Sequence, residues 1–442
     1  MDRGLGISPA PLKCREDEAA GHRAGRSPVR HKLSIAAILG ATLALACSGP
    51  TPDPPADEPQ HPSATADYRQ LDPPASDQAF APNLAVTGDE VVHTWLEKVD
   101  MGEGGVGHRL LFSRLAGTWT EPVVIAEGDD FFANWADLPG VVAAADGSLT
   151  AHWLAKTDEE TYAYSIFLAR STDRGATWTP LGRLNDDDTP TEHGFVSYVA
   201  EGDGVRAFWL DGRQMVEGGP MSVRTALVDA QVGPVEVLDE RVCECCSTDT
   251  AMTADGPVVV FRDRTETEIR DISIVRRVGS TWSRSHPIHT DGWEIDGCPV
   301  NGPEIAAAGD LAAVAWFTAA GAEPRVQVTF SQDGGGDFGP PVLVDGEGPL
   351  GRVDVVLDGE EALVTWLAVG AEMGEVRLRR VAADGTSGPS VTVAQTAATR
   401  AAGFPRLVRN GDLLYLAWVD VGEGDSSSIR LRAIPVSSIP MS

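Results

Sequence analysis

The stretch Ser171-Thr-Asp173-Arg-Gly175-Ala-Thr-Trp178 decides the fold, because these residue types at this spacing predict a tight turn between two strands. Ser171 and Asp173 can hydrogen-bond the backbone N–H groups of their own turn. Gly175 permits a positive φ, and Trp178 can fold back onto the flanking strands. A looser copy with Phe in the aromatic position reads Ser331-Gln-Asp333-Gly-Gly335-Gly-Asp-Phe338. The motif therefore predicts a repeated architecture made of strands.

Other turn signals recur along the chain at intervals of about 50 to 60 residues, which is typical of four-stranded propeller blades. They are Thr87-Gly-Asp89, Asp146-Gly147, Asp203-Gly204, Asp255-Gly256, Gly309-Asp310, Asp358-Gly359 and Asn410-Gly411. Each turn is followed by a short strand that ends in an aromatic residue: Trp95, Trp153, Trp209, Phe261, Trp316, Trp366 and Trp418. Such dipeptides favour hairpins. We expect an all-β fold, a β-propeller of four-stranded antiparallel blades with seven units, and six blades as the alternative.

The remaining strands of each unit follow the aromatic residue. Third strands are expected at Arg109–Leu115, Tyr164–Ser171, Ser222–Asp229, Arg270–Val278, Arg325–Ser331, Glu375–Val381 and Ser428–Ile434. Fourth strands follow in six units, and the seventh unit stops after three strands. Because an open sheet edge is a liability, we expect a strand near Tyr68–Leu71 to complete the last blade.

The two turn motifs and the blade pattern over residues 81–435 resemble the Asp-boxes of the sialidase and BNR-repeat superfamily of β-propellers. The resemblance implies hydrolysis of terminal sialic acids by three arginines, a tyrosine nucleophile with a glutamate partner, and an aspartic acid/base. The catalytic set is not matched. No Arg-Ile-Pro precedes the first blade, and Tyr198 and Tyr415 fall inside strands. Sialidases also have six blades, so the sequence leaves open whether this chain is an enzyme.

The N-terminal region predicts export. Residues 1–46 combine basic side chains with the apolar run 33–46 and read as a signal peptide of the lipoprotein type, followed by Cys47 as the lipidated residue. Ordinary signal cleavage nearby is the alternative. Residues 47–80 are rich in Pro, Ser, Asp and Thr and are expected to be a disordered tether. Residues 81–442 form the predicted propeller domain. We therefore expect a chain that is lipid-anchored to a membrane of the bacterial cell envelope.

The charge of the chain disfavours nucleic acid as a partner. Its 35 Lys and Arg residues face 65 Asp and Glu residues, for a formal net charge of −30. Phosphate binding needs a concentrated basic surface. An acidic surface of this kind is typical of a solvated protein.

Strand order predicts which residues share one rim of the propeller. If first strands run downward from an upper rim, second strands return to it, and the Asp-box turns lie below. Starts of first strands then bring Asn134, Trp135, Asp137, Glu192, His193, Cys245, Cys246, Cys298, Asn301, Arg352 and Phe404 to this rim. Ends of second strands add Glu97, Asp211, Arg213, Asp263, Arg264 and Asp420. Loops from every blade converge there, so we expect a ligand site at the upper rim.

Arginine and carboxylate side chains are the candidate ligand-binding groups on this rim, because Arg pairs with carboxylates in bidentate fashion. The candidates are His193, Asp211, Arg213, Arg262, Asp263, Arg264, Arg270 and Arg352. Arg213, Arg264 and Arg352 could imitate an arginine triad. A salt-bridged loop is the alternative for the run from Phe261 to Asp271, and a structural role is the alternative for His193.

Cys243, Cys245, Cys246 and Cys298 are expected to lie together at the openings of two adjacent units. In an oxidising compartment an even number of cysteines favours two disulfides. A bridge between adjacent Cys245 and Cys246 is the least comfortable of the three pairings, and the sequence does not choose between the other two. The alternative is a metal site of these four thiolates for zinc or cuprous copper, although no other cofactor is expected.

These features leave three hypotheses for the function. The first is a sialidase-like propeller that binds a glycan or another anionic small molecule at its upper rim. The second is a glycoside hydrolase resembling exo-sialidases. The third, which depends on the cysteines alone, is a lipoprotein that handles metal or redox equivalents through thiols.

Overall fold

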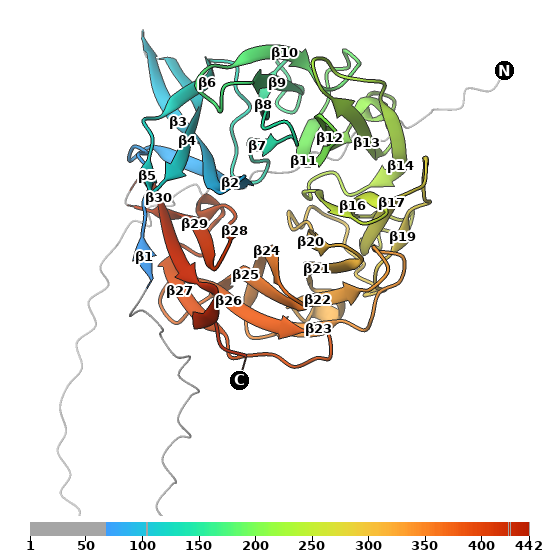
Figure 1. Ribbon diagram of the computed structural model, residues 1–442. Coiled ribbons are helices and arrows are strands. Elements are labelled where there is room, and N and C mark those ends of the chain that lie inside the picture. The colour runs from blue at the N-terminus through green and yellow to red at the C-terminus, as the bar shows by residue number, and fades with distance from the viewer. Residues whose placement is uncertain (1–67, 103–104, 423, 425, 442) are drawn as a thin grey trace, which may run out of the picture. The chain divides into compact units, whose positions relative to one another are not determined.

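A computed structural model describes residues 68–441 of the chain, apart from 103–104, 423 and 425. Within these residues seven antiparallel sheets are arranged around a central axis, so the fold is a seven-bladed β-propeller (Figure 1). The predicted all-β class and the count of seven are confirmed, and the alternative of six blades is excluded. The described residues contain no helix that is long and apolar enough to cross a membrane.

The first four blades follow one another along the chain. Blade one is β2 (Ala79–Thr87), β3 (Glu90–Gly102), β4 (Gly105–Ala116) and β6 (Val123–Gly128), with the short β5 (Thr118–Trp119). Blade two is β7 (Gly140–Ala143), β8 (Leu149–Lys156), β9 (Tyr164–Ser171) and β10 (Thr179–Arg183). Blade three is β11 (His193–Glu201), β12 (Gly204–Asp211), β13 (Met221–Val228) and β14 (Glu236–Val242). Blade four is β15 (Asp249–Thr253), β16 (Gly256–Arg262), β17 (Ile272–Val278) and β19 (His286–Pro287), with the short β18 (Thr281–Trp282).

The last three blades complete the ring. Blade five is β20 (Glu304–Ala308), β21 (Leu311–Thr318), β22 (Arg325–Ser331) and β23 (Val342–Asp345). Blade six is β24 (Pro349–Asp358), β25 (Glu361–Val369), β26 (Gly374–Ala382) and β27 (Val391–Thr396). Blade seven is β28 (Arg406–Asn410), β29 (Leu413–Val421), β30 (Ser427–Pro435) and β1 (Arg69–Gln70). Short 3₁₀ helices span Arg213–Glu217, Ala320–Ala322, Arg400–Ala402 and Val436–Ser438.

The N-terminal strand closes the ring, as the unfinished seventh unit predicts. β1 pairs antiparallel with β30, with Arg69 opposite Ala433. The indole N–H of Trp119, in blade one, then donates to the carbonyl oxygen of Leu71 over 2.7 Å. The folded domain therefore begins before residue 81, and residues 68–80 are not part of the predicted tether, because their backbone is hydrogen-bonded to blades one and seven. Residues 1–67, with the predicted signal peptide and Cys47, lie outside the described residues.

The apolar core is divided among the interfaces between neighbouring blades. Alternate side chains of each strand face the next sheet, as the period of two in a strand requires. Trp209 packs with Ile166 of blade two, and Trp366 packs with Val328 of blade five. Trp95, Trp209, Trp316 and Trp366, which mark the repeat in the sequence, are among the largest fully buried side chains. The same residues that reveal the repeat therefore hold the blades together.

The two Ser-x-Asp-x-Gly turns are held by their own hydrogen bonds. The Gly175 N–H donates to Ser171 Oγ over 2.8 Å, and the Thr177 N–H donates to Asp173 Oδ1 over 2.9 Å. Gly175 has φ +85°, and a Cβ there would lie 2.1 Å from the ring of Phe112 in blade one. Ser171 pairs with Leu149, beside the hairpin between β7 and β8. The turn therefore lies at the rim opposite the starts of the first strands, where it supports packing between blades.

Candidate functional site

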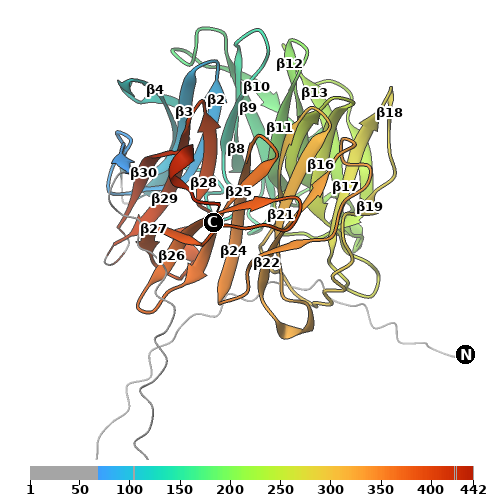
Figure 2. The ribbon, with the colours of Figure 1, turned by 60° about the horizontal axis from the view of Figure 1, so that its bottom comes forward.

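Strand registers bring the starts of the first strands and the ends of the second strands together at one rim. Ala79 lies opposite Glu97, and His193 lies opposite Asp211. The innermost strands, among them β2, β7, β11, β20, β24 and β28, surround the central channel (Figure 1) and run between the two faces of the ring (Figure 2). We call the face with the starts of these strands the upper rim.

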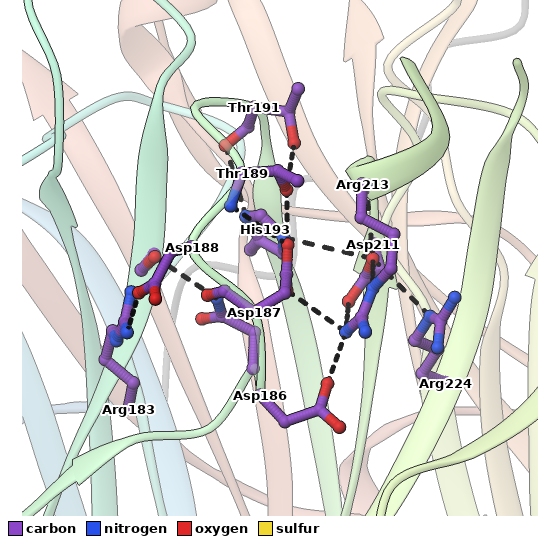
Figure 3. A network of polar contacts seen from close by, with 12 residues as sticks. Arg183, Asp186, Asp187, Asp188, Thr189, Thr191, His193, Asp211, Arg213 and Arg224 are labelled. Carbon is purple, nitrogen blue, oxygen red and sulfur yellow. Dashed lines mark hydrogen bonds and ion pairs between the residues drawn. The ribbon is translucent and has the colours of Figure 1, made fainter. Parts of the chain in front are cut away.

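His193 lies between two carboxylates on this rim (Figure 3). Its Nε2 is 3.2 Å from Asp187 Oδ1 and 3.9 Å from Asp211 Oδ1. Its Nδ1 lies 3.1 Å from the carbonyl oxygens of Tyr164 and Thr191, which can only accept, so Nδ1 carries a proton. Burial lowers the pKa of His193, but the hydrogen bond to Asp187 and the charges of Asp211 and Asp187 outweigh burial and raise it. The imidazole is therefore held toward its charged form.

Arg213 binds the same carboxylates and neutralises them. Its Nε lies 2.7 Å from Asp211 Oδ1, and its Nη2 lies 2.7 Å from Asp186 and 3.1 Å from Asp187. Arg224 adds a second guanidinium 3.4 Å from Asp211 Oδ1. The carboxylates of Asp186, Asp187 and Asp211 are thus close to two guanidiniums, those of Arg213 and Arg224, and to the imidazole of His193. The structure brings the predicted His193, Asp211 and Arg213 together, but as a mutually paired network, and their role in ligand binding stays a prediction.

The guanidinium of Arg262 is occupied by hydrogen bonds within the fold. It is only 1% exposed, and its guanidinium donates to the carbonyl oxygens of Asn301, Arg270 and Phe317 over 2.6 to 2.9 Å. The same group lies 4.8 Å from the ring centroid of Trp293. These contacts link blade four to blade five, and Nε, Nη1 and Nη2 all donate hydrogen bonds. Arg262 therefore has a structural role here.

The other arginines of the predicted cluster are paired with glutamates. Arg264 and Arg270 both contact Glu244 and Glu268, with Arg270 Nη1 2.9 Å from Glu244 Oε2. Asp263 belongs to the same rim; burial raises its pKa, although the N–H of Arg264 donates to its carboxyl group. This arrangement matches the salt-bridged loop that was the alternative for this run. It does not present an open guanidinium cluster.

Arg352 reaches across the channel mouth to Trp135. Its Nη1 donates to the carbonyl oxygens of Thr399 and Gly403 over 2.8 and 3.0 Å, and its guanidinium lies 4.7 Å from the Trp135 ring centroid. Trp135 also stacks on Phe404, with ring centroids 6.0 Å apart. Burial and the charge of nearby Arg400 lower the pKa of Arg352 to about 10. The segment before β7, in blade two, therefore contacts blades six and seven and crosses the mouth of the channel.

A cavity of about 220 Å³ lies in the central channel, with residues of blades one to five and seven in its wall. Its lining includes Ala136, next to Trp135 in the sequence, and Phe404, which stacks on Trp135. Leu138 also lines the cavity. Several polar atoms in this wall are buried and have no partner among the described residues. They are Asp137 Oδ2, His152 Nδ1, Tyr198 Oη and Ser247 Oγ. Buried polar groups are normally hydrogen-bonded, so such a concentration marks a site for a polar ligand or water. We call it the channel cavity.

Asp137 is a buried acid in the wall of the channel cavity. Its Oδ1 accepts a hydrogen bond from the Phe195 N–H over 2.8 Å. Burial raises the pKa of Asp137 to about 8, against a smaller opposing effect of this hydrogen bond. Burial likewise raises the pKa of neighbouring Glu192 to about 7. Asp137 is therefore mostly protonated near neutral pH and Glu192 is about half protonated, where an ordinary carboxyl group is ionised.

Three further carboxyl groups share one arginine in the channel. Arg406 Nη1 lies 2.9 Å from Glu304 Oε1, and its Nε lies 3.3 Å from Asp354 Oδ2. Asp249 accepts the Ile305 N–H over 2.7 Å. Burial raises the pKa of Glu304 and of Asp249, and it raises that of Asp354 to about 6. With a single guanidinium among three buried acids, the group favours retaining a proton.

The sequence placed Asp137 on the rim but did not select it as a ligand-binding residue, and it missed His152, Tyr198, Glu304 and Arg406. For Glu304 and Arg406, the sequence does contain a signal that could have identified them. Glu304 and Arg406 open the innermost strands of their blades, where the neighbouring residues are apolar. A charged residue at that position faces the channel, because side chains of a first strand alternate between the channel and the blade interface.

One of the two predicted disulfides is present. Cys245 is bonded to Cys298, which joins the segments that lead into β15 and β20. Cys243 and Cys246 are free and buried. The four cysteines thus lie together, as the repeat predicts, but a site of four thiolates for zinc or copper is not formed while Cys245 and Cys298 are bonded to each other.

Comparisons with known proteins bear on the fold. No protein-family model and no curated protein sequence matches the chain. A solved structure of a polysaccharide lyase, an ulvan lyase bound to -[GlcA(1-4)Rha3S]-, has a TM-score of 0.54 and 10% identity, covering 83% of this chain and 96% of that one. An α-L-arabinofuranosidase from Fusarium graminearum has a TM-score of 0.49 and 13% identity, covering 85% and 99%. The NanB sialidase from Streptococcus pneumoniae has a TM-score of 0.44 and 11% identity, covering 86% and 70%. At these identities the ulvan lyase match supports the propeller fold alone.

Proposed function

We propose that this protein binds a glycan, with one sugar unit in the channel cavity and the adjoining unit against Trp135. The carrying observation is the set of unpartnered polar atoms around a cavity of about 220 Å³, which is of the size of a single sugar ring. Sugar-binding sites need several fixed donors and acceptors in a concave wall. The partly exposed ring of Trp135 suits the apolar face of a sugar ring.

A neutral saccharide fits the electrostatics of this site better than a polyanion. The predicted arginines of the rim are paired with carboxylates or with backbone carbonyl oxygens. Arg406, the arginine in the cavity wall, already contacts Glu304 and Asp354. An incoming carboxylate or sulfate would have to displace one of these partners. The ulvan lyase of similar fold is bound to an acidic saccharide, so acidic chains belong in the test.

The proposal is tested by calorimetric titration of the protein with a panel of neutral and acidic oligosaccharides. Trp135→Ala should weaken the affinity at least about tenfold, or roughly 1.4 kcal/mol, because an aromatic contact of this kind is lost. Asp173→Asn, in the turn at the opposite rim, is the control and should leave the affinity unchanged. Equal losses in both variants, or no saccharide bound at millimolar concentration, would refute the site.

Glycoside hydrolysis is the second candidate, and the pKa of Asp137 favours it. A carboxylic acid that stays protonated near pH 7 can donate a proton to the oxygen of a departing sugar. The carboxyl groups around Arg406 are the candidate bases in the same wall. Fluorogenic glycosides, a sialoside among them, test this activity. Turnover should fall as the pH rises through about 8, where Asp137 loses its proton, and Asp137→Asn should abolish it. Turnover that survives Asp137→Asn would remove Asp137 as the acid.

We also propose that the mature chain is exported and anchored through lipid on Cys47, at the bacterial cell envelope. The support is the order of basic, apolar and small residues before Cys47. Mass spectrometry of the mature N-terminal peptide should find a lipid-modified Cys47. In Cys47→Ser the protein should move from the membrane fraction to the soluble fraction, and an unmodified Cys47 in the mature wild-type chain would contradict the anchor.

A further inference from the structure

The four cysteines of the folded domain form one sulfur cluster on the upper rim, apart from the channel cavity. Cys243 Sγ lies 2.9 Å from Cys246 Sγ, within hydrogen-bond distance, and 4.0 Å from Cys245 Sγ. Cys245 is in turn bonded to Cys298. A free dithiol is thus in contact with a formed disulfide, and the sulfur of Cys243 is next to both.

The surroundings of Cys243 favour a thiolate. Arg270 Nη1 lies 3.4 Å from its sulfur. Burial raises the pKa of Cys243, but the thiol of Cys246, the N–H of Cys245 and the charges of Arg270 and Arg262 outweigh burial and lower it. Burial and the neighbouring Cys243 raise the pKa of Cys246. The pair therefore consists of one nucleophilic sulfur and one that keeps its proton, which is the asymmetry that thiol–disulfide exchange uses.

We propose that Cys243 and Cys246 are a redox-active dithiol that exchanges with the Cys245–Cys298 disulfide. The Cys243 thiolate attacks Cys245 Sγ, so that a Cys243–Cys245 bond forms and Cys298 leaves as a thiolate. Cys246 gives its proton to this thiolate and attacks Cys243 Sγ, which forms Cys243–Cys246 and releases Cys245 as a thiolate. Two electrons move from one cysteine pair to the other, and no outside oxidant or reductant is consumed.

This exchange goes beyond glycan binding and would change how the upper rim is held. The Cys245–Cys298 bond spans 53 residues and links blade four to blade five, whereas a Cys243–Cys246 bond lies within one loop. Ser247, in the wall of the channel cavity, follows Cys246 directly. The position of the disulfide therefore determines whether the cavity wall is tied to blade five.

Trapping free thiols and mapping the disulfides tests the proposal. The full chain is held at pH 7.5 in a series of glutathione buffers, quenched in acid, treated with N-ethylmaleimide and digested for mass spectrometry. We expect two isomers, one with Cys245–Cys298 and one with Cys243–Cys246. Cys246→Ser should stop at the first step and accumulate the Cys243–Cys245 peptide with Cys298 alkylated. Cys243→Ser should contain the Cys245–Cys298 peptide alone.

A matched pair of arginine variants separates the chemistry from the stability of the loop. Arg270 and Arg264 both contact Glu244 and Glu268, and Arg270 also contacts Cys243. The pKa of Cys243 is lowered to about 6. Arg270→Gln should therefore slow alkylation of Cys243 about tenfold at pH 5, where its thiol is mostly protonated and a rise of one pKa unit reduces the thiolate in proportion. Arg264→Gln breaks the same kind of ion pair and should slow it about twofold at most.

Two results would overturn the exchange. The first is wild-type protein in which Cys245–Cys298 is the one disulfide found at every glutathione ratio, with no Cys243–Cys245 peptide in Cys246→Ser. The second is stoichiometric zinc or copper in the purified protein, released on alkylation of Cys243 and Cys246, because these thiols would then be metal ligands. Unfolding curves of both cysteine variants show whether the fold is retained when they are compared.

Discussion

Asp137 and Asn301 make the same contact in two parts of the ring, one as an acid and the other as an amide. The Phe195 N–H of blade three donates to Asp137 Oδ1 over 2.8 Å, and the Arg352 N–H of blade six donates to Asn301 Oδ1 over 2.7 Å. Both donors are non-glycine residues with positive φ, +54° and +55°. A glycine precedes each donor, where a Cβ would lie 2.0 Å from Asp137 Oδ2 or 2.2 Å from Asn301 Oδ1. We call each contact a clasp between blades.

The two clasps differ in the second atom of the side chain. Asn301 Nδ2 donates to the carbonyl oxygens of Pro299 and Leu350 over 3.2 and 3.4 Å, so the amide is satisfied. Asp137 Oδ2 has no partner among the described residues, and the residue lines the channel cavity. The clasp itself needs one acceptor oxygen, which an amide supplies without the cost of burying an ionisable group. The acid at position 137 therefore points to a use beyond holding the blades together.

The largest effect is expected when the glycine of either clasp is replaced. Gly194→Ala and Gly351→Ala should each lower the free energy of unfolding by about 3 kcal/mol, because the new Cβ overlaps the side-chain oxygen. Gly351 has φ +79°, so backbone strain adds to its cost. Urea unfolding measures both. Gly297→Ala, where the nearest atom is 3.9 Å away, is the control. A change below 1 kcal/mol in both clasp variants would contradict the predicted overlap, and a large loss in only one of them would break the equivalence.

Removing the acceptor should cost less, and unequally. Asp137→Ala and Asn301→Ala each leave a backbone N–H without its side-chain partner, at about 1 to 3 kcal/mol. Asn301→Ala should be the worse of the two, because it also removes two hydrogen bonds of the amide, while Asp137→Ala removes an oxygen without a partner. Urea unfolding of the two alanine variants measures this difference in the free energy of unfolding. A larger loss in Asp137→Ala would mean that Asp137 Oδ2 is satisfied in solution.

The Asp137 clasp should also respond to pH, whereas the Asn301 clasp should not. The pKa of Asp137 is raised from 3.8 to about 8, so between these values the native state holds a proton that the unfolded chain has released. Stability should therefore fall with rising pH by up to about 1.4 kcal/mol per unit in this window, and the loss should be complete above it. Asp137→Asn should remove this slope, and Asn301→Asp should add one. Unfolding at pH 5, 6, 7, 8 and 9 gives the slopes, and parallel curves for wild type and Asp137→Asn would contradict the raised pKa.

The smallest effect on stability is expected at the neighbouring contact between blades four and five. A Cβ on Gly302 would lie 2.3 Å from Ser247 Oγ, but this hydroxyl has no partner among the described residues. Ser247→Ala should change the free energy of unfolding by less than about 0.5 kcal/mol, since no hydrogen bond is lost. Its affinity for saccharide should nevertheless fall, because the hydroxyl lines the cavity. A stability loss with unchanged affinity would make Ser247 structural.

Much of the fold could be predicted because its signals are local and repeated. The turn glycines, the marker tryptophans and the missing fourth strand of the last unit gave the ring and its closure. The predicted arginines show the limit of such reasoning. Arg262 was selected as a ligand-binding group, yet its guanidinium holds the carbonyl oxygens of Asn301 and Phe317 from the next blade. No spacing in the sequence shows which charges neutralise one another, because the partners come from different blades.

The sequence by itself predicted seven units, with six blades as the alternative, together with the closing strand and the rim on which the polar residues gather, because each prediction depends on hairpins and on the alternation of side chains within one unit. The tertiary structure alone decided which cysteines are bonded, that Trp135 reaches Arg352 and Phe404 across the channel, and that Asp137 is buried with a free oxygen. These outcomes depend on distances between blades that are far apart in the chain. They also depend on whether a group loses its water, because the same carboxyl group titrates differently when buried than when exposed.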